Sequence, residues 1–282
     1  HTGLQFMSSC AGILYFDYFL TLPEEIERFW TRSGNTFFWT SLLFVMNRYL
    51  PLLGSIPIIF EFFAVMPEHV RFCRCRSLQL YHQYLAAATQ TIVAVLLLVR
   101  VNAMYNKNTR ILLMLVVTIC ASLATAAWSI LSGDELPRAT EDPSIVSYGC
   151  DLSVSVQQPL ITPDFAGAWG SVLAFDTLVF ILTVVKALQI GIFLRGSLCR
   201  IILRDGAIYF GFIVLTHIVN VLTLLVSRKP ESKGLCVTLT NVISSTLMTR
   251  SMLNLRDPRR GRSPMGYTGS LPIHTATEDA ES

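Results

Sequence analysis

The chain has 282 residues, of which 52% are hydrophobic and only 15% are charged, and its formal net charge is +3. A soluble domain usually carries about 25% charged residues, whereas the mean hydropathy here is +0.52. These values exclude a pair of ordinary soluble domains and indicate an integral membrane protein. We expect the lipid bilayer as its surroundings and no nucleic-acid partner.

Seven stretches of about 20 mostly apolar residues follow one another, each long enough to cross a hydrocarbon core as a helix. Lipid offers the backbone no hydrogen-bond partner, so such stretches must be helical. The sequence therefore predicts an all-α bundle of seven transmembrane helices. The predicted spans are Gly3–Leu22, Thr36–Phe60, Ser77–Val99, Ile111–Leu131, Gly167–Leu194, Gly206–Ser227 and Gly234–Leu255.

The first, second and seventh spans have special features. No basic flank precedes the first run and no cleavage site follows it, so we interpret it as a span rather than a signal peptide. The chain begins at His1 rather than Met, and we expect a short preceding piece. Pro51, Gly54 and Pro57 predict a kink or break in the second span. The seventh span is the weakest, because Arg250 interrupts it.

Basic residues predict the orientation, because cytoplasmic segments are enriched in Lys and Arg. With the N-terminus outside, 13 basic residues fall on the inner side and 7 on the outer side. This favours a receptor-like topology, with the N-terminus out and the C-terminus in, and the plasma membrane rather than internal membranes. Arg71, Arg74 and Arg76, just before the third span, argue against it.

Two segments lie outside the predicted spans, which belong to a transmembrane domain of residues 1–255. The acidic loop Ser132–Ala166 would lie outside the membrane, and its part Ser144–Gln158 alternates apolar and polar residues like a short hairpin. A solvated loop without a ligand role is the alternative. Residues 256–282 form a predicted cytoplasmic tail, basic near the membrane and then too polar to bury a core, and we expect it to be disordered.

Two of the seven cysteines suggest an outer bridge. Cys75 precedes the third span, and Cys150 lies in the loop between the fourth and fifth spans. Many seven-helix receptors join these two places by a disulfide. We therefore predict a bridge from Cys150 to Cys75 or Cys73, the alternative being unpaired thiols.

Ionisable side chains inside spans are costly and by default suggest function. We expect several polar side chains to form one buried network, in which Arg48 extends inward to pair with Asp17. The alternative is a set of structural interhelical hydrogen bonds, each contributing about 1 kcal/mol. The candidate network consists of Asp17, Asn47, Arg48, Asp176, His217, Asn220 and Asn241.

Several specific chemistries lack their residues. A retinal protein needs a lysine in the middle of its last helix, and Gly234–Leu255 contains no lysine. A zinc-dependent lipid hydrolase needs clustered histidines, but only His82 and His217 lie within spans. No nucleotide-binding loop or nucleophile elbow is present. We therefore expect no cofactor, no metal and no catalytic residues, and predict that the protein is not an enzyme.

A signature covers about residues 10–55. Its pieces are Tyr15-Phe-Asp17-Tyr18-Phe-Leu-Thr-Leu-Pro-Glu-Glu-Ile26, Phe29-Trp30 and Asn47-Arg48-Tyr49-Leu50-Pro51-Leu52-Leu53. Shorter pieces follow at Arg100-Val-Asn-Ala-Met-Tyr105, Leu203-Arg-Asp-Gly-Ala-Ile-Tyr209 and Leu253-Asn-Leu-Arg-Asp257. The chain resembles a fungal, chiefly basidiomycete, family known as domain of unknown function 6533. The resemblance implies a membrane protein of about seven helices and assigns no role to any residue.

Three functions remain open. The helix count, the orientation, the candidate bridge and the tail favour a receptor-like sensor with an unknown extracellular ligand and a cytoplasmic signalling partner. A transporter or channel, with a polar path for a solute, is the second hypothesis. A membrane enzyme acting on lipid is the third and weakest.

Overall fold

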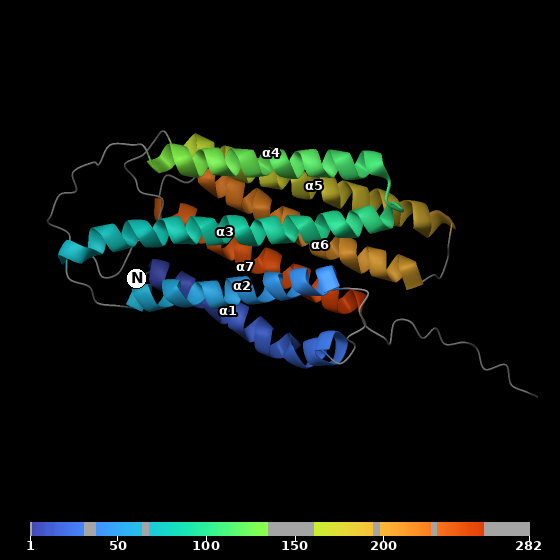
Figure 1. The fold of residues 1–282 in the computed structure, drawn as a ribbon, viewed down its shortest axis with the longest axis horizontal. Coiled ribbons are helices and arrows are strands. Elements are labelled where there is room, and N and C mark those ends of the chain that lie inside the picture. Colours follow the sequence, from blue (N-terminus) through green and yellow to red (C-terminus); the bar gives the residue numbers. More distant parts are fainter. Residues whose placement is uncertain are drawn as a thin grey trace, which may run out of the picture.

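The computed structural model describes residues 2–30, 38–63, 68–134, 161–193, 198–226 and 230–256. Within these ranges the chain forms seven α-helices and one π-helical turn, and no strand (Figure 1). The elements are α1 (Thr2–Glu25), η1 (Ile26–Trp30), α2 (Phe38–Phe63), α3 (Glu68–Met104), α4 (Thr109–Asp134), α5 (Ile161–Phe193), α6 (Leu198–Val226) and α7 (Pro230–Leu255).

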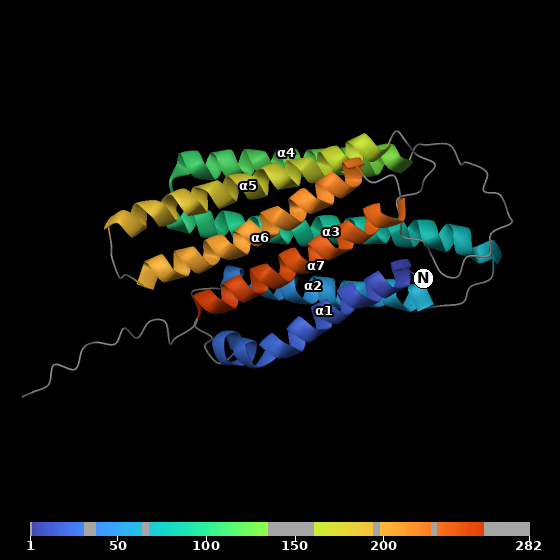
Figure 2. The same ribbon diagram turned by 180° about the vertical axis from the view of Figure 1, so that it is seen from behind.

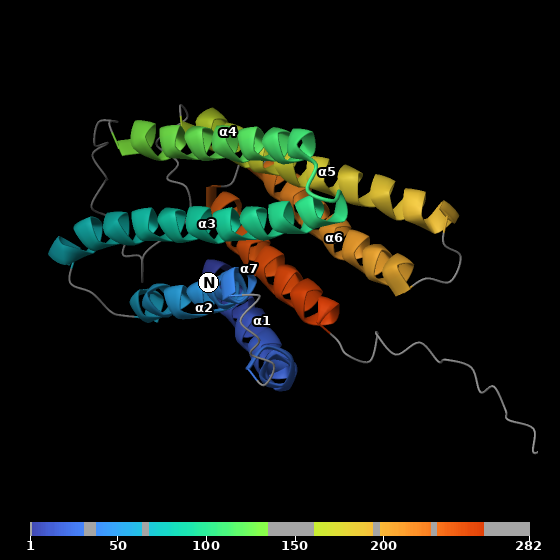
Figure 3. The ribbon, with the colours of Figure 1, turned by 45° about the vertical axis from the view of Figure 1, so that its right-hand side comes forward.

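The helices lie side by side along the long axis, and successive helices run in opposite directions (Figures 1 and 2). We call the end where α1 and α7 begin the N-side, and the end where they finish the C-side. Figure 3 shows α4 and α5 at one flank of the bundle and α1 and α2 at the other, with α7 between them. Helix α7 contacts α1, α2, α3 and α6. Helix α3 likewise contacts α2, α4, α5 and α7, so these two helices together join distant parts of the bundle.

The surface of the bundle is that of a membrane protein. Large apolar side chains are exposed on it, among them Phe16, Trp39, Phe60, Trp128 and Val226. In water such a surface would cost free energy, but lipid is as apolar as these side chains. Five described helices, α2 to α6, are long and apolar enough to cross a membrane. The chain is an integral membrane protein.

Helices α1 and α7 are not among the five that are long and apolar enough to cross a membrane, although both belong to the bundle. The reason in α7 is that its polar side chains point inward. Thr240, Asn241, Ser244, Ser245 and Thr249 are all buried. Mean hydropathy counts these side chains as unfavourable to a span, but burial against other helices removes them from lipid.

The helix ends differ from the predicted spans, because hydropathy reports the part of a helix that meets lipid and not where the helix stops. Helix α3 begins at Glu68 rather than Ser77, so the basic residues before the predicted span belong to its first turns. Helix α1 continues through Pro23 to Glu25. The break expected in the second span is wrong, since α2 continues as an α-helix through Pro51 and Pro57.

The largest apolar core lies where α3, α5, α6 and α7 meet, and includes Leu97, Phe175, Phe210 and Met248. Smaller clusters join α1, α2 and α7 around Leu14 and Leu52, or η1, α2 and α7 around Phe29 and Phe44. These clusters hold the polar side chains described next in fixed positions.

Candidate functional site: a polar core around α7 and two cavities

The most strongly charged part of the interior lies on the C-side, between α1 and α2. The Nε atom of Arg48 lies 2.7 Å from the Glu25 carboxylate, with only 4% and 0% of the two side chains exposed. The Glu25 carboxylate also accepts hydrogen bonds from Tyr49 and Trp30, both at 3.1 Å. A buried carboxylate and guanidinium tolerate burial only when paired and hydrogen-bonded in this way.

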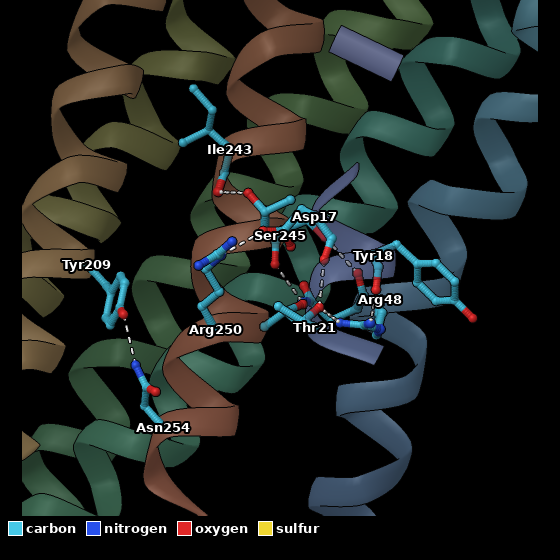
Figure 4. Close-up of polar contacts among 12 residues, drawn as sticks. Asp17, Tyr18, Thr21, Arg48, Tyr209, Ile243, Ser245, Arg250 and Asn254 are labelled. Atoms are coloured by element: carbon cyan, nitrogen blue, oxygen red, sulfur yellow. Dashed lines mark hydrogen bonds and ion pairs between the residues drawn. The ribbon is translucent and has the colours of Figure 1, made fainter. Parts of the chain in front are cut away.

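A second ion pair joins α1 to α7. The Nε atom of Arg250 lies 2.6 Å from Asp17, and the Arg250 side chain remains 39% exposed. Thr21 connects the two pairs, since it donates to the Asp17 carbonyl at 2.7 Å and accepts from Arg48 at 2.6 Å (Figure 4). Arg48 also donates to the Tyr18 carbonyl and lies over the Tyr18 ring. We call Asp17, Thr21, Glu25, Arg48 and Arg250 the C-side cluster.

The direct pairing of Asp17 with Arg48 is wrong: Arg48 donates to the Thr21 hydroxyl, which donates to the main-chain carbonyl of Asp17 and not to its carboxylate. The reason lies in the helix ends. Because α1 extends past Pro23, it carries Glu25 to the level that Arg48 reaches. Asp17 is then left to Arg250, which approaches from α7. Glu25 lies beyond the end of the predicted first span, Gly3–Leu22, so hydropathy does not predict it as a partner of Arg48.

Asn47 fastens α2 to α7 by three hydrogen bonds. Its amide donates to the Ser245 carbonyl at 3.1 Å and to the Thr249 hydroxyl at 3.0 Å. In return, the Ser245 hydroxyl donates to the Asn47 carbonyl at 2.7 Å. That carbonyl lacks its usual helical partner four residues on, because Pro51 has no N–H. Ser245 thus satisfies the backbone group that the proline leaves free, as hydroxyl side chains commonly do in membrane helices.

Two further groups of contacts close the C-side end. Arg28 donates to the Leu253 carbonyl at 2.8 Å, and Arg256 lies 3.8 Å above the Phe29 ring. Burial there lowers the pKa of the Arg256 guanidinium below its ordinary value. On α3, Arg100 donates to Ser251 and packs over the Phe210 ring.

The middle of the bundle holds a different pair. Asp176 of α5 and His217 of α6 lie 3.2 Å apart, and Ser244 of α7 lies 3.4 Å from the same histidine nitrogen. A catalytic triad needs the acid and the hydroxyl on opposite ring nitrogens. Here both partners share Nε2, so the arrangement does not match a triad. One turn along α6, Asn220 is fully buried and neither of its amide atoms has a hydrogen-bond partner within the described residues.

On the N-side, α3 and α7 are joined by uncharged groups. Gln90 donates to Asn241 at 3.0 Å, and His82 lies 3.1 Å from the Thr238 hydroxyl. Together with the contacts above, these bonds place polar partners along most of the length of α7, from Thr238 to Asn254, whose amide donates to Tyr209.

Two cavities lie beside these N-side contacts. The α4 cavity, of about 110 Å³, lies between α3, α4 and α5 and is lined by Gln90, Ser129, Trp169 and Phe175 among others. The α1 cavity, of about 300 Å³, lies between α1, α2, α3 and α7. His82 and Ala86 line both cavities. In the part of the chain that the structure describes, neither lining includes a Lys, Arg, Asp or Glu side chain.

The candidate network of the sequence analysis falls into three groups rather than one. Asp17, Asn47 and Arg48 lie on the C-side, Asp176, His217 and Asn220 lie in the middle, and Asn241 lies on the N-side. Four further residues were not predicted from the sequence. Three are partners of Arg48 or Asn47, namely Glu25, Thr21 and Ser245, and the fourth is the cavity residue Ser129. Glu25 stood within the recognised signature, whereas no pattern distinguishes Ser129 from other serines in spans.

Other candidates cannot be placed in this way. The bridge from Cys150 to Cys75 or Cys73, the hairpin Ser144–Gln158 and the tail after residue 256 lie outside the described residues and side chains. Within the described part of the chain, Cys10, Cys120 and Cys236 are free thiols. No three His, Cys, Asp or Glu side chains of this part gather as metal ligands would.

The comparisons with known proteins agree with the signature. Residues 5–53 match the model of a family of unknown function (DUF6533). This match covers most of α1 and half of α2, with Asp17, Thr21, Glu25, Asn47 and Arg48. No curated protein matches the chain. No solved structure matches it either.

Proposed function

We propose that this protein is a receptor-like sensor of the plasma membrane, in which all seven helices cross the bilayer. One observation supports this most. Uncharged cavities lie at the N-side, whereas paired charges hold α1, α2 and α7 together at the C-side. Helix α7 takes part in both regions, because Thr238 and Asn241 lie near the cavities and Arg250 belongs to the C-side cluster. A ligand that moves α7 would therefore also change the contacts of Arg250 on the C-side.

The proposed orientation puts the N-side outside the cell. The excess of basic residues in the C-side segments, 13 against 7, supports it. The cavities then open toward the outer half of the bilayer and the C-side cluster lies near the cytoplasm. Tags at the N-terminus and after Ser282 should report opposite sides, with the second in the cytoplasm. Two tags on one side would contradict seven spans.

A coupling screen tests the sensing role. Cells that express the chain are exposed to a library of small molecules, and activation of a co-expressed G protein is recorded. We expect a concentration-dependent signal from at least one chemical class. A variant that fills the cavity, Ala126→Phe, should lose the signal, whereas Ala127→Phe on the neighbouring exposed position should keep it. Equal responses of both variants would contradict ligand sensing at this cavity.

A transporter or channel is the second candidate, and the polar side chains along α7 favour it. These groups occur at nearly every level of the helix, from Thr238 through Ser244 to Arg250. A conducting path would use Asp176 as its intramembrane charge, so Asp176→Asn should abolish flux into liposomes that contain the purified protein. Ion or solute flux that depends on Asp176, without any coupling signal, would favour transport over sensing.

A further inference from the structure

Ser129 is an exception among the hydroxyl groups of α4. Thr118, Ser122 and Thr125 of the same helix each donate to a carbonyl of the preceding turn, which is how hydroxyls in helices are usually satisfied. Ser129 is only 5% exposed, and its buried hydroxyl has no hydrogen-bond partner within the described structure. A buried hydroxyl without a partner is costly.

The position of Ser129 indicates what completes its hydrogen bonding. Ser129 lines the α4 cavity together with Trp169 and Phe175 of α5 and His82 of α3. The aromatic and alanine side chains of the lining offer an apolar surface. A molecule in this cavity can therefore bury an apolar body and still present one polar group to the Ser129 hydroxyl.

The charge of that molecule follows from the lining. Among the described residues, no Lys, Arg, Asp or Glu side chain lines the α4 cavity, so an ion placed there would lose its hydration without gaining a counter-charge from them. An uncharged molecule does not carry this cost. The cavity lies next to lipid, because Leu123 both lines it and is 42% exposed on the outer surface of the bundle.

We propose that the α4 cavity binds an uncharged, mainly apolar small molecule whose single hydroxyl or carbonyl group is hydrogen-bonded by Ser129. This ligand class rests on the proposed function, because it is the class that the sensor would detect from the bilayer. Binding itself can be measured without any signal, so the two proposals can fail separately.

The test uses a photoreactive octanol that carries a diazirine, added to the purified full chain in lipid nanodiscs. After illumination, mass spectrometry identifies the labelled residues. Unlabelled octanol, octanoate, octylammonium and octane then compete for the site, each at a known concentration in the bilayer. These four molecules share one tail and differ only in the head group.

We expect labelling of the α4 cavity that octanol displaces at a concentration at least tenfold lower than octanoate or octylammonium. Ser129→Ala should weaken the binding of octanol about three- to tenfold, the effect of one hydrogen bond between neutral groups. The matched control Thr118→Val removes a hydroxyl from α4 outside the lining and should not change it. Ala126→Phe should abolish displaceable labelling, and Ala127→Phe should not.

Four results would overturn the proposal. Labelling confined to lipid-facing residues, without competition, would mean that the cavity takes no such ligand. Equal competition by octanoate would remove the argument from charge. Equal competition by octane, or an unchanged affinity in Ser129→Ala, would show an apolar occupant such as a lipid tail. A chain that binds octanol as expected but couples to nothing would instead contradict the proposed function alone.

Discussion

Arg48 of α2 lies 2.7 Å from Glu25 at the end of α1, and this ion pair is more deeply buried than the pair of Asp17 with Arg250. The difference decides what each carboxylate contributes to stability. Removing one partner of a buried pair leaves the other charge without compensation. A partner that is partly exposed keeps its access to water, and its loss costs less.

We therefore expect Glu25→Gln to destabilise the protein by about 3 kcal/mol and Asp17→Asn by about 1 kcal/mol. The measurement is the melting temperature of each purified variant in the same detergent. The double variant Glu25→Gln with Arg48→Gln should be less destabilised than the two single effects added together, because it no longer strands a charge. Strict additivity would contradict the pairing of Glu25 with Arg48.

Asn47 should matter for the attachment of α2 to α7. Asn47→Ala removes two donated hydrogen bonds and leaves the Ser245 carbonyl and the Thr249 hydroxyl with fewer partners. We expect a loss of about 2 kcal/mol, read as a lower melting temperature. Ser55→Ala is the matched control, since Ser55 donates only to a carbonyl of its own helix. An equal effect of both substitutions would argue against a special role of Asn47.

Gly206 allows Arg100 to reach α7. A methyl group on Gly206 would overlap a terminal nitrogen of Arg100, so Gly206→Ala should displace the guanidinium from Ser251 and Phe210. We expect a cost of about 1 kcal/mol from these lost contacts. Gly12→Ala, where nothing lies within 4 Å, should be neutral or slightly stabilising.

The Gly206 effect should depend on Arg100. In a background of Arg100→Ala, adding Gly206→Ala should no longer lower the melting temperature, because no guanidinium remains to be displaced. A cost that persists in this background would mean that the backbone approach of α6 itself, rather than the arginine, requires glycine.

Asp176 and His217 should behave as a pair. Asp176→Leu alone leaves His217 without its carboxylate partner, and His217→Leu alone leaves a buried carboxylate without its histidine. We expect each to cost about 3 kcal/mol, whereas the double substitution to leucine should cost less than either. Melting temperatures and the yield of folded protein measure this. A double variant that is less stable than both single variants would contradict a mainly structural pair.

The sequence predicts the helices well and their ends poorly. Apolar length alone identifies seven helices, because lipid enforces helical structure. It does not show that α3 begins at Glu68 or that α1 passes Pro23, since helices continue into water wherever their side chains allow. Glu25 therefore looked like a loop residue.

The candidate site was predictable only in part. Burial of charged residues within spans marked Asp17 and Arg48 correctly as groups that need partners. Which partner each side chain finds depends on how the helices pack. Arg250, the partner of Asp17, lies more than 200 residues away from it in the sequence. The cavities left no pattern in the sequence, because a void is a property of several helices together.

The proposed sensing function requires that the N-side cavities and the C-side cluster be coupled through α7. Coupling between two sites is reciprocal, so a change at the C-side must alter affinity at the N-side. The most direct test is the affinity for the photoreactive octanol in Asp17→Asn, compared with Glu24→Gln, a carboxylate of α1 whose side chain is 47% exposed. We predict at least a fivefold change in Asp17→Asn and none in Glu24→Gln. Equal affinities in the wild-type chain and both folded variants would contradict coupling of the cavities to the C-side cluster.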